Sequence, residues 1–352
     1  MNMKNIVSPL LNWYGQNARD LPWRHNRNPY RVWISEIMLQ QTRVEAVKGY
    51  FSRFLKAAPD IPSLAVLPQE KLLKLWEGLG YYSRVRNLQK AAKQAMEQYG
   101  GKLPATYEQL LALPGIGSYT AGAVASIAFG QPVPAVDGNV LRVWMRLTAD
   151  DSDISDPAVK RRTERVLLPI MPGTRSGDFN QALMELGALV CIPHAAPHCL
   201  LCPVADFCAA HRMGKELQFP VKKPKPPRRV ERKTILLLEM DGRLAIRRRP
   251  SKGLLASMWE LPGFEGVLSQ ADAVAATRSL GLEPIRLQPL APSKHIFTHV
   301  EWHMTGWRVQ LAPSENNRLV WADAENLVKR YPMPSAFRPF LQIYLQGRNS
   351  GG

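Results

Sequence analysis

Cysteine is scarce in this chain of 352 residues, which has four, all between positions 191 and 208. Disulfide bonds therefore cannot tie distant parts of the sequence together, and a disulfide-stapled secreted fold is not indicated. Long apolar runs are missing too, because the longest small-apolar stretch, Ala121 to Gly130, is far too short to span a bilayer. The N-terminus has polar and aromatic residues where a signal peptide needs an unbroken apolar stretch. We expect a cytoplasmic protein without membrane contact.

Acidic residues are also few, since 29 Asp and Glu stand against 46 Lys and Arg, which gives a net charge of +17. Such an excess favours a polyanionic partner, either nucleic acid or an anionic membrane surface, although it can also serve solubility alone. With no candidate span, nucleic acid is the better interpretation. The length predicts two or three domains, and the share of apolar residues, 45%, is ordinary for a globular protein.

The four cysteines are separated by seven, two and five residues and are Cys191, Cys199, Cys202 and Cys208. Thiolates packed this closely can converge on iron or zinc, while disulfides here would staple only a short loop. Zinc sites usually show two Cys-x2-Cys pairs and this chain has one, so we favour one [4Fe–4S] cluster over zinc. Three nearby histidines could also be ligands, but four thiolates complete the site, and we expect solvated side chains at His194, His198 and His211.

The organisation of the chain changes near residue 219. Up to about residue 212 the apolar spacing predicts helices, at 29–42, 70–77, 86–99, 121–129 and 140–147. Residues 219–232 are rich in proline, lysine and arginine, which predicts an extended linker. Beyond it we expect a hairpin turning at Asp241-Gly242, further strands near 295–311 and 318–322, and helices near 269–280 and 335–346. The predicted fold class is α+β and multidomain, with an all-α domain at 1–218 and a mixed α/β domain at 233–352.

Residues 113–122 contain a Gly-x-Gly turn formed by Gly115 and Gly117, followed by an apolar helix. Such a turn lets the backbone approach another chain closely and directs free N–H groups outward, a geometry that binds phosphate. On its own the pattern is more often only a tight turn. Combined with the basic charge and the cysteines, it resembles the helix-hairpin-helix DNA glycosylases, the superfamily of endonuclease III. Lyase-competent members have a lysine two residues past the second glycine. Tyr119 stands there in this chain, which implies a glycosylase without a lysine-based strand-cutting step.

Three further motifs resemble the MutY-type adenine DNA glycosylases: Leu21-Pro22-Trp23-Arg24, Val32 to Thr42, and Gly78 to Arg84. The resemblance implies an enzyme of base excision repair that flips adenine out of duplex DNA and hydrolyses its N-glycosidic bond. The adenine would be mispaired with 8-oxoguanine or guanine. We expect a monomer that works on double-stranded DNA and associates with the nucleoid.

Two carboxylates are the candidate catalytic groups. Glu36 lies in a helix with apolar neighbours on all sides, and burial favours the protonated acid, although an ordinary exposed helix glutamate is the alternative. Asp137 precedes a helix, where an aspartate is by default an N-cap. The resemblance implies that Glu36 donates a proton to the adenine and that Asp137 stabilises the positive sugar. It also implies that Tyr119 and Asn139 support them; a packed tyrosine and a helix-start asparagine are the alternatives.

The expected DNA contacts follow from the same resemblance. It implies that Arg24 contacts the flipped base and that Gln41 and Tyr81 wedge into the stack, while Gly115, Gly117 and Ser118 bind the backbone. The second domain resembles a Nudix fold through Trp259-Glu260-Leu261-Pro262-Gly263, but residues 269–281 have one acidic side chain, Asp272, so nucleotide hydrolysis is not expected. There Thr298 and His299 would read 8-oxoguanine, with a strand-end turn as the alternative.

The sequence departs from the family pattern at two places, and two other functions compete with adenine excision. The family usually has six residues between its first two cysteines, and serine where this chain has Thr298. A pyrimidine-directed relative would share most of these motifs. A non-catalytic or redox-sensing iron–sulfur protein would share the cysteines, but it has no need for Glu36 and Asp137.

Overall fold

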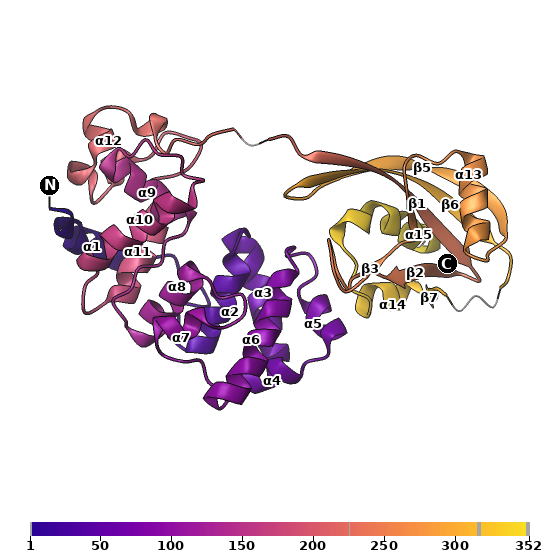
Figure 1. Cartoon of the computed structure of the whole chain (residues 1–352), viewed down its shortest axis with the longest axis horizontal. Coiled ribbons are helices and arrows are strands. Elements are labelled where there is room, and N and C mark those ends of the chain that lie inside the picture. Colours follow the sequence, from indigo (N-terminus) through magenta and orange to yellow (C-terminus); the bar gives the residue numbers. More distant parts are fainter. Residues whose placement is uncertain (1, 225, 315–317, 350–352) are drawn as a thin grey trace. The chain divides into compact units, whose positions relative to one another are not determined.

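The computed structural model describes residues 2–224, 226–314 and 318–349, and the chain divides into two compact units (Figure 1). The first unit is formed by residues up to Leu67 together with the chain from Ser83 to the linker. The second is formed by Pro68–Tyr82 together with the chain from Pro226 onward. A short segment from the first part of the sequence thus belongs to the C-terminal unit.

The first unit is helical, as the sequence predicts. Its helices are α1 (Val7–Asn17), α2 (Pro29–Leu39), α3 (Val44–Ala57), α4 (Ile61–Val66), α6 (Ser83–Tyr99), α7 (Tyr107–Leu111), α8 (Ser118–Phe129), α9 (Gly138–Thr148), α10 (Pro157–Leu167), α11 (Ser176–Leu189) and α12 (Ala209–Arg212). Short 3₁₀ helices lie at Met3–Ile6, Leu168–Ile170, Cys199–Leu201, Ala205–Phe207 and Glu216–Gln218. In the described part of the chain, no helix has both the length and the hydrophobicity needed to cross a membrane.

Two buried helices form the centre of this unit. α2 has no polar face, and every residue from Val32 to Met38 is buried. α8 consists largely of small residues and is buried around its circumference, which allows the backbone of neighbouring segments to come close. A Cβ atom added at Gly122 would lie 2.2 Å from the carbonyl oxygen of Pro134. This close approach explains why the helix predicted at 121–129 has glycine at position 122.

The second unit contains one sheet with helices beside it. Its strands are β1 (Arg229–Met240), β2 (Arg243–Arg248), β3 (Trp259–Glu260), β4 (Gly263–Glu265), β5 (Pro284–Ile296), β6 (Val300–Leu311) and β7 (Val320–Ala322), and its helices are α5 (Gln69–Leu75), α13 (Gln270–Ser279), α14 (Ala324–Lys329) and α15 (Arg338–Asn349). The strand order is β3-β2-β1-β6-β5, with β4 paired to β1 and β7 to β2. The predicted hairpin is confirmed, because Met240 pairs with Arg243 across the Asp241-Gly242 turn.

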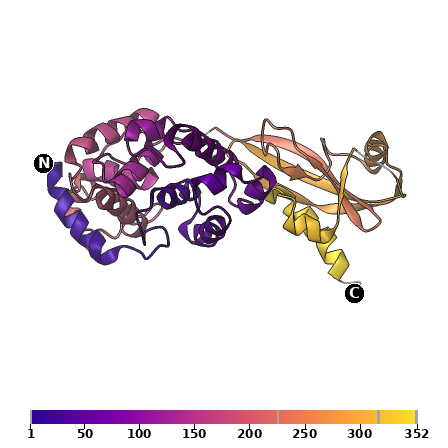
Figure 2. The same cartoon turned by 90° about the horizontal axis from the view of Figure 1, so that it is seen from below.

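Alternation along β1 gives the sheet two cores. Ile235 and Leu237 belong to a core that includes side chains around α15, whereas Leu236 and Leu238 belong to a core on the side of α13. Figure 2 shows the yellow C-terminal helix running along one side of the orange sheet. The mixed α/β character expected for this half of the chain is therefore confirmed.

Strand β5 is not anticipated by the sequence, because Pro284, Pro289 and Pro292 argue against a strand. Proline lacks a donor for the ladder, but it is tolerated on an edge strand, and β5 is the edge of this sheet. The register shifts between Pro284 and Arg286 and between Leu290 and Ser293. The range in which the sequence predicts strand, residues 295–311, contains the end of β5, a turn at 297–299 and the whole of β6.

Both ends of the expected linker, residues 219–232, make contacts with folded parts of the chain. Phe219 is buried in the core of the helical unit, and Ile154 N donates to Val221 O at 2.9 Å. At the other end, β1 already begins at Arg229, where it pairs with Val300 of β6. The extended linker between these contacts is therefore shorter than the composition of residues 219–232 indicates.

We predict that Gly122→Ala lowers the free energy of unfolding by roughly 1–3 kcal/mol, because the added methyl group must displace the backbone at Pro134. Urea unfolding of the intact chain measures this effect. Gly15→Ala is the matched control, since Gly15 also lies in a helix but has open space around its Cα atom. Equal stability of Gly122→Ala and the unaltered protein would contradict the packing described here.

Candidate active site

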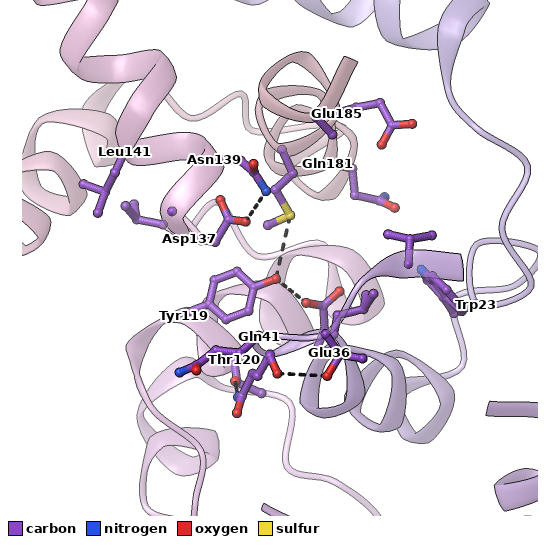
Figure 3. Close-up of a pocket in the computed structure, with 18 of the residues that line it drawn as sticks. Trp23, Glu36, Gln41, Tyr119, Thr120, Asp137, Asn139, Leu141, Gln181 and Glu185 are labelled. Carbon is purple, nitrogen blue, oxygen red and sulfur yellow. Dashed lines mark hydrogen bonds between the residues drawn. The ribbon is translucent and has the colours of Figure 1, made fainter. Parts of the chain in front are cut away.

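A cavity of ≈ 830 Å³ in the helical unit collects most of the predicted site residues (Figure 3). It is lined by residues of α2, α8, α9 and α11 and the loops next to them, and by Val44 of α3 and Lys160 of α10. The predicted residues that line it are Arg24, Glu36, Gln41, Gly117, Ser118, Tyr119, Asp137 and Asn139. Gly115, Tyr81, Thr298, His299 and the cysteines do not line it.

Glu36 reaches the cavity from the buried helix α2 and is 6% exposed. Burial raises the pKa of Glu36 to about 7, and the negative charge of Asp137 adds to the rise. The hydrogen bond that Tyr119 donates to Glu36 opposes this shift, as does the cation of Arg24. The exposed-glutamate alternative is wrong, and a substantial share of Glu36 holds its proton near neutral pH.

Tyr119 is the second residue of α8, and its hydroxyl donates to Oε2 of Glu36. Figure 3 shows this hydroxyl pointing to Glu36, with Asp137 and Asn139 above the ring. Burial and the two neighbouring carboxylates raise the pKa of Tyr119 well above its ordinary value. The phenol therefore keeps its proton and acts as a donor to the acid.

Asp137 is the N-cap of α9, as its position predicts, and it also lines the cavity. Its Oδ1 accepts from the N–H of Val140 at 2.8 Å, so it caps α9, and its Oδ2 accepts from Nδ2 of Asn139 at 2.8 Å. Burial raises the pKa of Asp137, and these hydrogen bonds counteract the rise. Arg142 holds Asn139 in place through its Oδ1 at 2.9 Å. Gly187 leaves the space for this arrangement, because a Cβ atom there would lie 2.7 Å from Cβ of Asn139.

A second buried glutamate of the cavity was missed by the sequence analysis. Glu185 is 1% exposed and accepts from Nε of Arg19 at 2.7 Å and from a guanidinium nitrogen of Arg24 at 2.7 Å. Burial alone would raise its pKa, but the two arginines outweigh it and lower the pKa of Glu185 to about 2. The signal that identified Glu36, an acid among apolar neighbours in a helix, was present here too, since Leu183, Met184 and Leu186 surround Glu185 in sequence.

The hairpin glycines have different roles in the fold. Gly115 has a φ of +77°, and a Cβ atom there would lie 2.6 Å from Cβ of Asn87, so both conformation and packing require glycine. Gly117 has an ordinary φ of −95° and open space above it, so the fold does not require glycine at this position. The Ser118 hydroxyl donates to Glu164 at 2.8 Å.

The two expected wedge residues share an uncommon backbone conformation. Gln41 has a φ of +57° and Tyr81 a φ of +46°, in the left-handed region that non-glycine residues rarely adopt. Behind Gln41, Arg84 donates to the carbonyl oxygens of Ile37, Met38 and Gln40, which end α2 earlier than the predicted residue 42. Tyr81 is 45% exposed and belongs to the second unit.

Thr298 and His299 are exposed and lie in the turn between β5 and β6. Phe297 stabilises the turn. Its N–H donates to Val300 O at 2.8 Å, and its ring packs on Trp302 with the ring centroids 4.8 Å apart. The Thr298 hydroxyl lies 3.0 Å from the hydroxyl of Tyr81. Two residues separated by 217 positions in sequence, Tyr81 expected to wedge into the base stack and Thr298 expected to read the lesion, are therefore in contact.

The four cysteines surround one small cavity, together with His211 and Glu216, and none of them forms a disulfide. Arg146 donates to Sγ of Cys191 at 3.2 Å. His211 is not a solvated loop histidine as expected, because its Nδ1 lies 2.5 Å from Glu216. Donor atoms of Cys199, His211 and Glu216 lie within 4.8 Å of one another. Four cysteines that line one cavity beside the buried cation of Arg146 fit a metal centre with thiolate ligands.

Comparisons with known proteins agree with this geometry. Residues 34–169 match the HhH-GPD superfamily of base excision DNA repair proteins, and residues 234–342 match the NUDIX domain. The adenine DNA glycosylase of Mus musculus is 35% identical, over 98% of this chain and 79% of its own length. That of Buchnera aphidicola subsp. Baizongia pistaciae (strain Bp) is 32% identical, over 90% of each chain. The chain belongs to the adenine DNA glycosylase family. Members of this family of repair enzymes cleave N-glycosyl bonds.

Solved structures resemble the helical unit. A thermostable thymine-DNA glycosylase is 30% identical with a TM-score of 0.55 and covers 60% of this chain and 96% of its own. Endonuclease III in a non-covalent complex with DNA is 26% identical with a TM-score of 0.51 and covers 61% and 99%. The helix-hairpin-helix glycosylase fold is thus shown for the first part of the chain.

We predict that Glu36→Gln stabilises the protein at pH 8. Between about pH 4.5 and 7 the folded protein retains the Glu36 proton that the unfolded chain releases, so the free energy of unfolding falls as the pH rises through this range. A rise in pKa from 4.5 to about 7 corresponds to roughly 3 kcal/mol, which a neutral glutamine recovers. Urea unfolding at pH 8 should show this gain, and at pH 4 the two proteins should be nearly equal.

Glu185→Gln is the matched control and should have the opposite effect. The pKa of Glu185 is lowered to about 2, so its ionised form stabilises the fold at every pH above the unfolded value. Loss of the carboxylate leaves Arg19 and Arg24 without their partner, and we expect roughly 3–5 kcal/mol of destabilisation at pH 8. If both substitutions destabilise equally at pH 8, the description of Glu36 as a buried acid is wrong.

Proposed function

We propose that this chain excises adenine paired with 8-oxoguanine in duplex DNA by hydrolysis of the N-glycosidic bond, without a lysine-based lyase step. The observation that carries the proposal is the pair of carboxylates in one cavity, with Glu36 protonated near neutral pH and Asp137 held by hydrogen bonds. Two carboxylates in different environments can act as acid and anion in the same reaction. A cavity of ≈ 830 Å³ has room for a flipped nucleotide.

Glu36 is the proposed proton donor. Its Oε2 accepts from Tyr119, so the acidic proton is carried on Oε1 and can be directed to N7 of adenine. Once N7 is protonated, the C1′–N9 bond breaks and its electron pair moves into the base, which leaves as neutral adenine. Tyr119 thus orients the acid, in keeping with the role that the resemblance implies.

Asp137 is the proposed stabiliser of the positive sugar. When the bond breaks, C1′ becomes electron-deficient, and a carboxylate close to it lowers the energy of that charge or bonds to it transiently. Asn139 keeps Asp137 oriented through the 2.8 Å hydrogen bond to Oδ2. Water then adds to C1′ and gives up a proton, which yields an abasic sugar and leaves the carboxylates ready for another turnover.

The proposed absence of lyase chemistry is supported by the cavity lining. A Schiff base needs an unprotonated amine that can attack C1′. Tyr119 occupies the position where related lyases have lysine. The lysine that lines the cavity, in the part of the chain that the structure describes, is Lys160, which pairs with Glu164 at 3.7 Å. The side chain of Lys160 is thus engaged with Glu164.

We propose that residues 1–218 form the catalytic domain, that 219–232 connect it to the rest, and that 233–352 form an 8-oxoguanine recognition domain. Asp272, the acidic residue of 269–281, is committed to a capping box with Ser269, and this favours recognition over nucleotide hydrolysis. Thr298 and His299 are exposed for contact with the lesion, and Gly117 offers open backbone to a phosphate. Arg24, Gln41, Tyr81, Gly115 and Ser118 complete the proposed DNA contacts, and the enzyme is proposed to act as a monomer on the nucleoid.

We further propose that the cysteines hold one [4Fe–4S] cluster. The donor set fits, because four sulfur atoms line one cavity and Arg146 supplies a compensating cation. When bound, such a cluster would tie together residues 191–208 and supply a redox-capable centre.

The decisive experiment measures adenine release from an A:8-oxoguanine duplex under single-turnover conditions, with and without alkali. Strand breaks should appear only after alkali, and borohydride should trap no covalent complex. Parallel A:G and T:G duplexes separate an adenine-specific enzyme from a pyrimidine-directed relative. Base release from T:G alone, or breaks without alkali, would overturn the proposal, and in the second case Lys160→Ala would test the remaining amine.

We predict that Glu36→Gln reduces adenine excision by at least about 10²–10⁴-fold, the usual contribution of a general acid, while duplex binding stays nearly unchanged. In the unaltered enzyme the excision rate should fall as the pH rises through about 7, because Glu36 loses its proton in this range. Glu97→Gln, an exposed helix position, is the control. Unchanged excision by Glu36→Gln would exclude Glu36 as the donor.

For the cysteine site we predict visible iron–sulfur absorption and iron and acid-labile sulfide in the ratio of a [4Fe–4S] cluster. Cys202→Ser should lose this absorption and weaken duplex binding, because residues 191–208 lose their cross-link. Zinc without visible absorption in the purified protein would contradict the cluster assignment and point to Cys199, His211 and Glu216 as part of a different donor set.

A further inference from the structure

The segment Pro68–Tyr82, here named the docking segment, packs against the C-terminal chain through α5 and the residues that follow it. Oε1 of Glu70 accepts from the indole N–H of Trp259 at 3.0 Å. Lys74 donates to the carbonyl oxygen of Tyr331 at 3.1 Å. The docking segment therefore reaches two separate parts of the C-terminal chain.

Glu77 completes this set of contacts. Its Oε1 accepts from the backbone N–H of Met333 at 2.8 Å, and its other oxygen pairs with Lys74 at 2.6 Å. The partners on the C-terminal chain are well packed, since Trp259, Tyr331 and Met333 are 8%, 7% and 4% exposed. A charge-assisted bond between partly buried groups is stronger than one on an open surface. Glu77 and Lys74 thus form specific, partly buried contacts with the C-terminal chain and are not an isolated surface ion pair.

The docking segment ends in a turn with three residues of positive φ, and the one that is not glycine, Tyr81, is strained. Gly78, Gly80 and Tyr81 have φ values of 98°, 69° and 46°, and only glycine adopts such values without strain. Trp76, which is fully buried, donates to the carbonyl oxygen of Gly80 at 3.1 Å. The strained conformation of Tyr81 persists only while the residues before it stay fixed.

This conformation places the Tyr81 hydroxyl 3.0 Å from Thr298. We infer that Glu77 and Lys74 are positioning residues for recognition of the base opposite adenine: they fix the docking segment so that Tyr81 and Thr298 meet the lesion as a preformed pair. The inference rests on the proposed function, and in particular on the proposed wedging of Tyr81 into the base stack and the proposed contact of Thr298 with 8-oxoguanine. It assigns a share of lesion preference to two residues for which no contact with DNA is proposed.

The test compares single-turnover excision from A:8-oxoguanine and A:G duplexes. In Glu77→Ala the ratio of the two rates should fall about ten-fold or more, because a charged hydrogen-bond partner is lost. The rate on A:G at saturating enzyme should stay within about two-fold of the unaltered protein, because the chemistry uses Glu36 and Asp137. Glu77→Gln retains an acceptor oxygen and should rescue most of the ratio. Glu97→Ala is the control for removal of an exposed glutamate.

A double substitution separates positioning from a general loss of structure. In the Tyr81→Ala background, Glu77→Ala should reduce the ratio no further, because the residue it positions is absent. If Glu77→Ala proves unfolded by circular dichroism, Lys74→Met provides the second variant, since it removes the contact with Tyr331 but keeps the aliphatic chain.

The outcomes distinguish this inference from the proposed function. If the unaltered protein releases no adenine, or shows no preference for 8-oxoguanine, the proposed function fails. If the unaltered protein has the preference and both Glu77→Ala and Lys74→Met retain it, the positioning role is wrong while the proposed function stands. Additive effects of Glu77→Ala and Tyr81→Ala would also overturn it.

Discussion

The hydrogen bond from Tyr119 to Glu36 is the interaction on which the proposed chemistry depends. α2 has no polar face, and the burial that follows from this raises the pKa of Glu36 to about 7. A buried carboxyl without a partner would be costly, and Tyr119 satisfies one oxygen without removing the proton. The tyrosine can do so because burial keeps its own pKa high. The acid is thus made available by the fold and oriented by a single hydroxyl.

Three carboxylates line the same cavity, and their surroundings give them different states. The protonated form of Glu36 is well populated near neutral pH because burial raises its pKa to about 7, whereas two arginines lower the pKa of the buried Glu185 to about 2. Burial also raises the pKa of Asp137, and the hydrogen bonds from Val140 and Asn139 act against that rise. Identical side-chain chemistry therefore supports an acid, a structural anion and a proposed stabiliser of positive charge within one pocket.

The sequence predicted what local patterns determine and missed what depends on distant partners. The buried helix of Glu36, the small-residue helix α8 and the turn at Asp241-Gly242 each follow from spacing within a few residues. The edge strand β5 did not, because its prolines are tolerated only at the position that the whole sheet assigns to it. Likewise, the ionised state of Glu185 depends on arginines more than 160 positions away.

The most consequential feature hidden from the sequence is the assignment of Pro68–Tyr82 to the C-terminal unit. All residues that line the catalytic cavity come from the helical unit, whereas Tyr81 and Thr298 both belong to the other. In the proposed function, excision and recognition of the opposite base therefore rest on different groups of side chains. A substitution in one group can change specificity without changing the chemical step. Because Tyr81 lies in a strained turn, its position is sensitive to every contact that holds the segment before it, and this makes the docking segment the place where such separation is most easily observed.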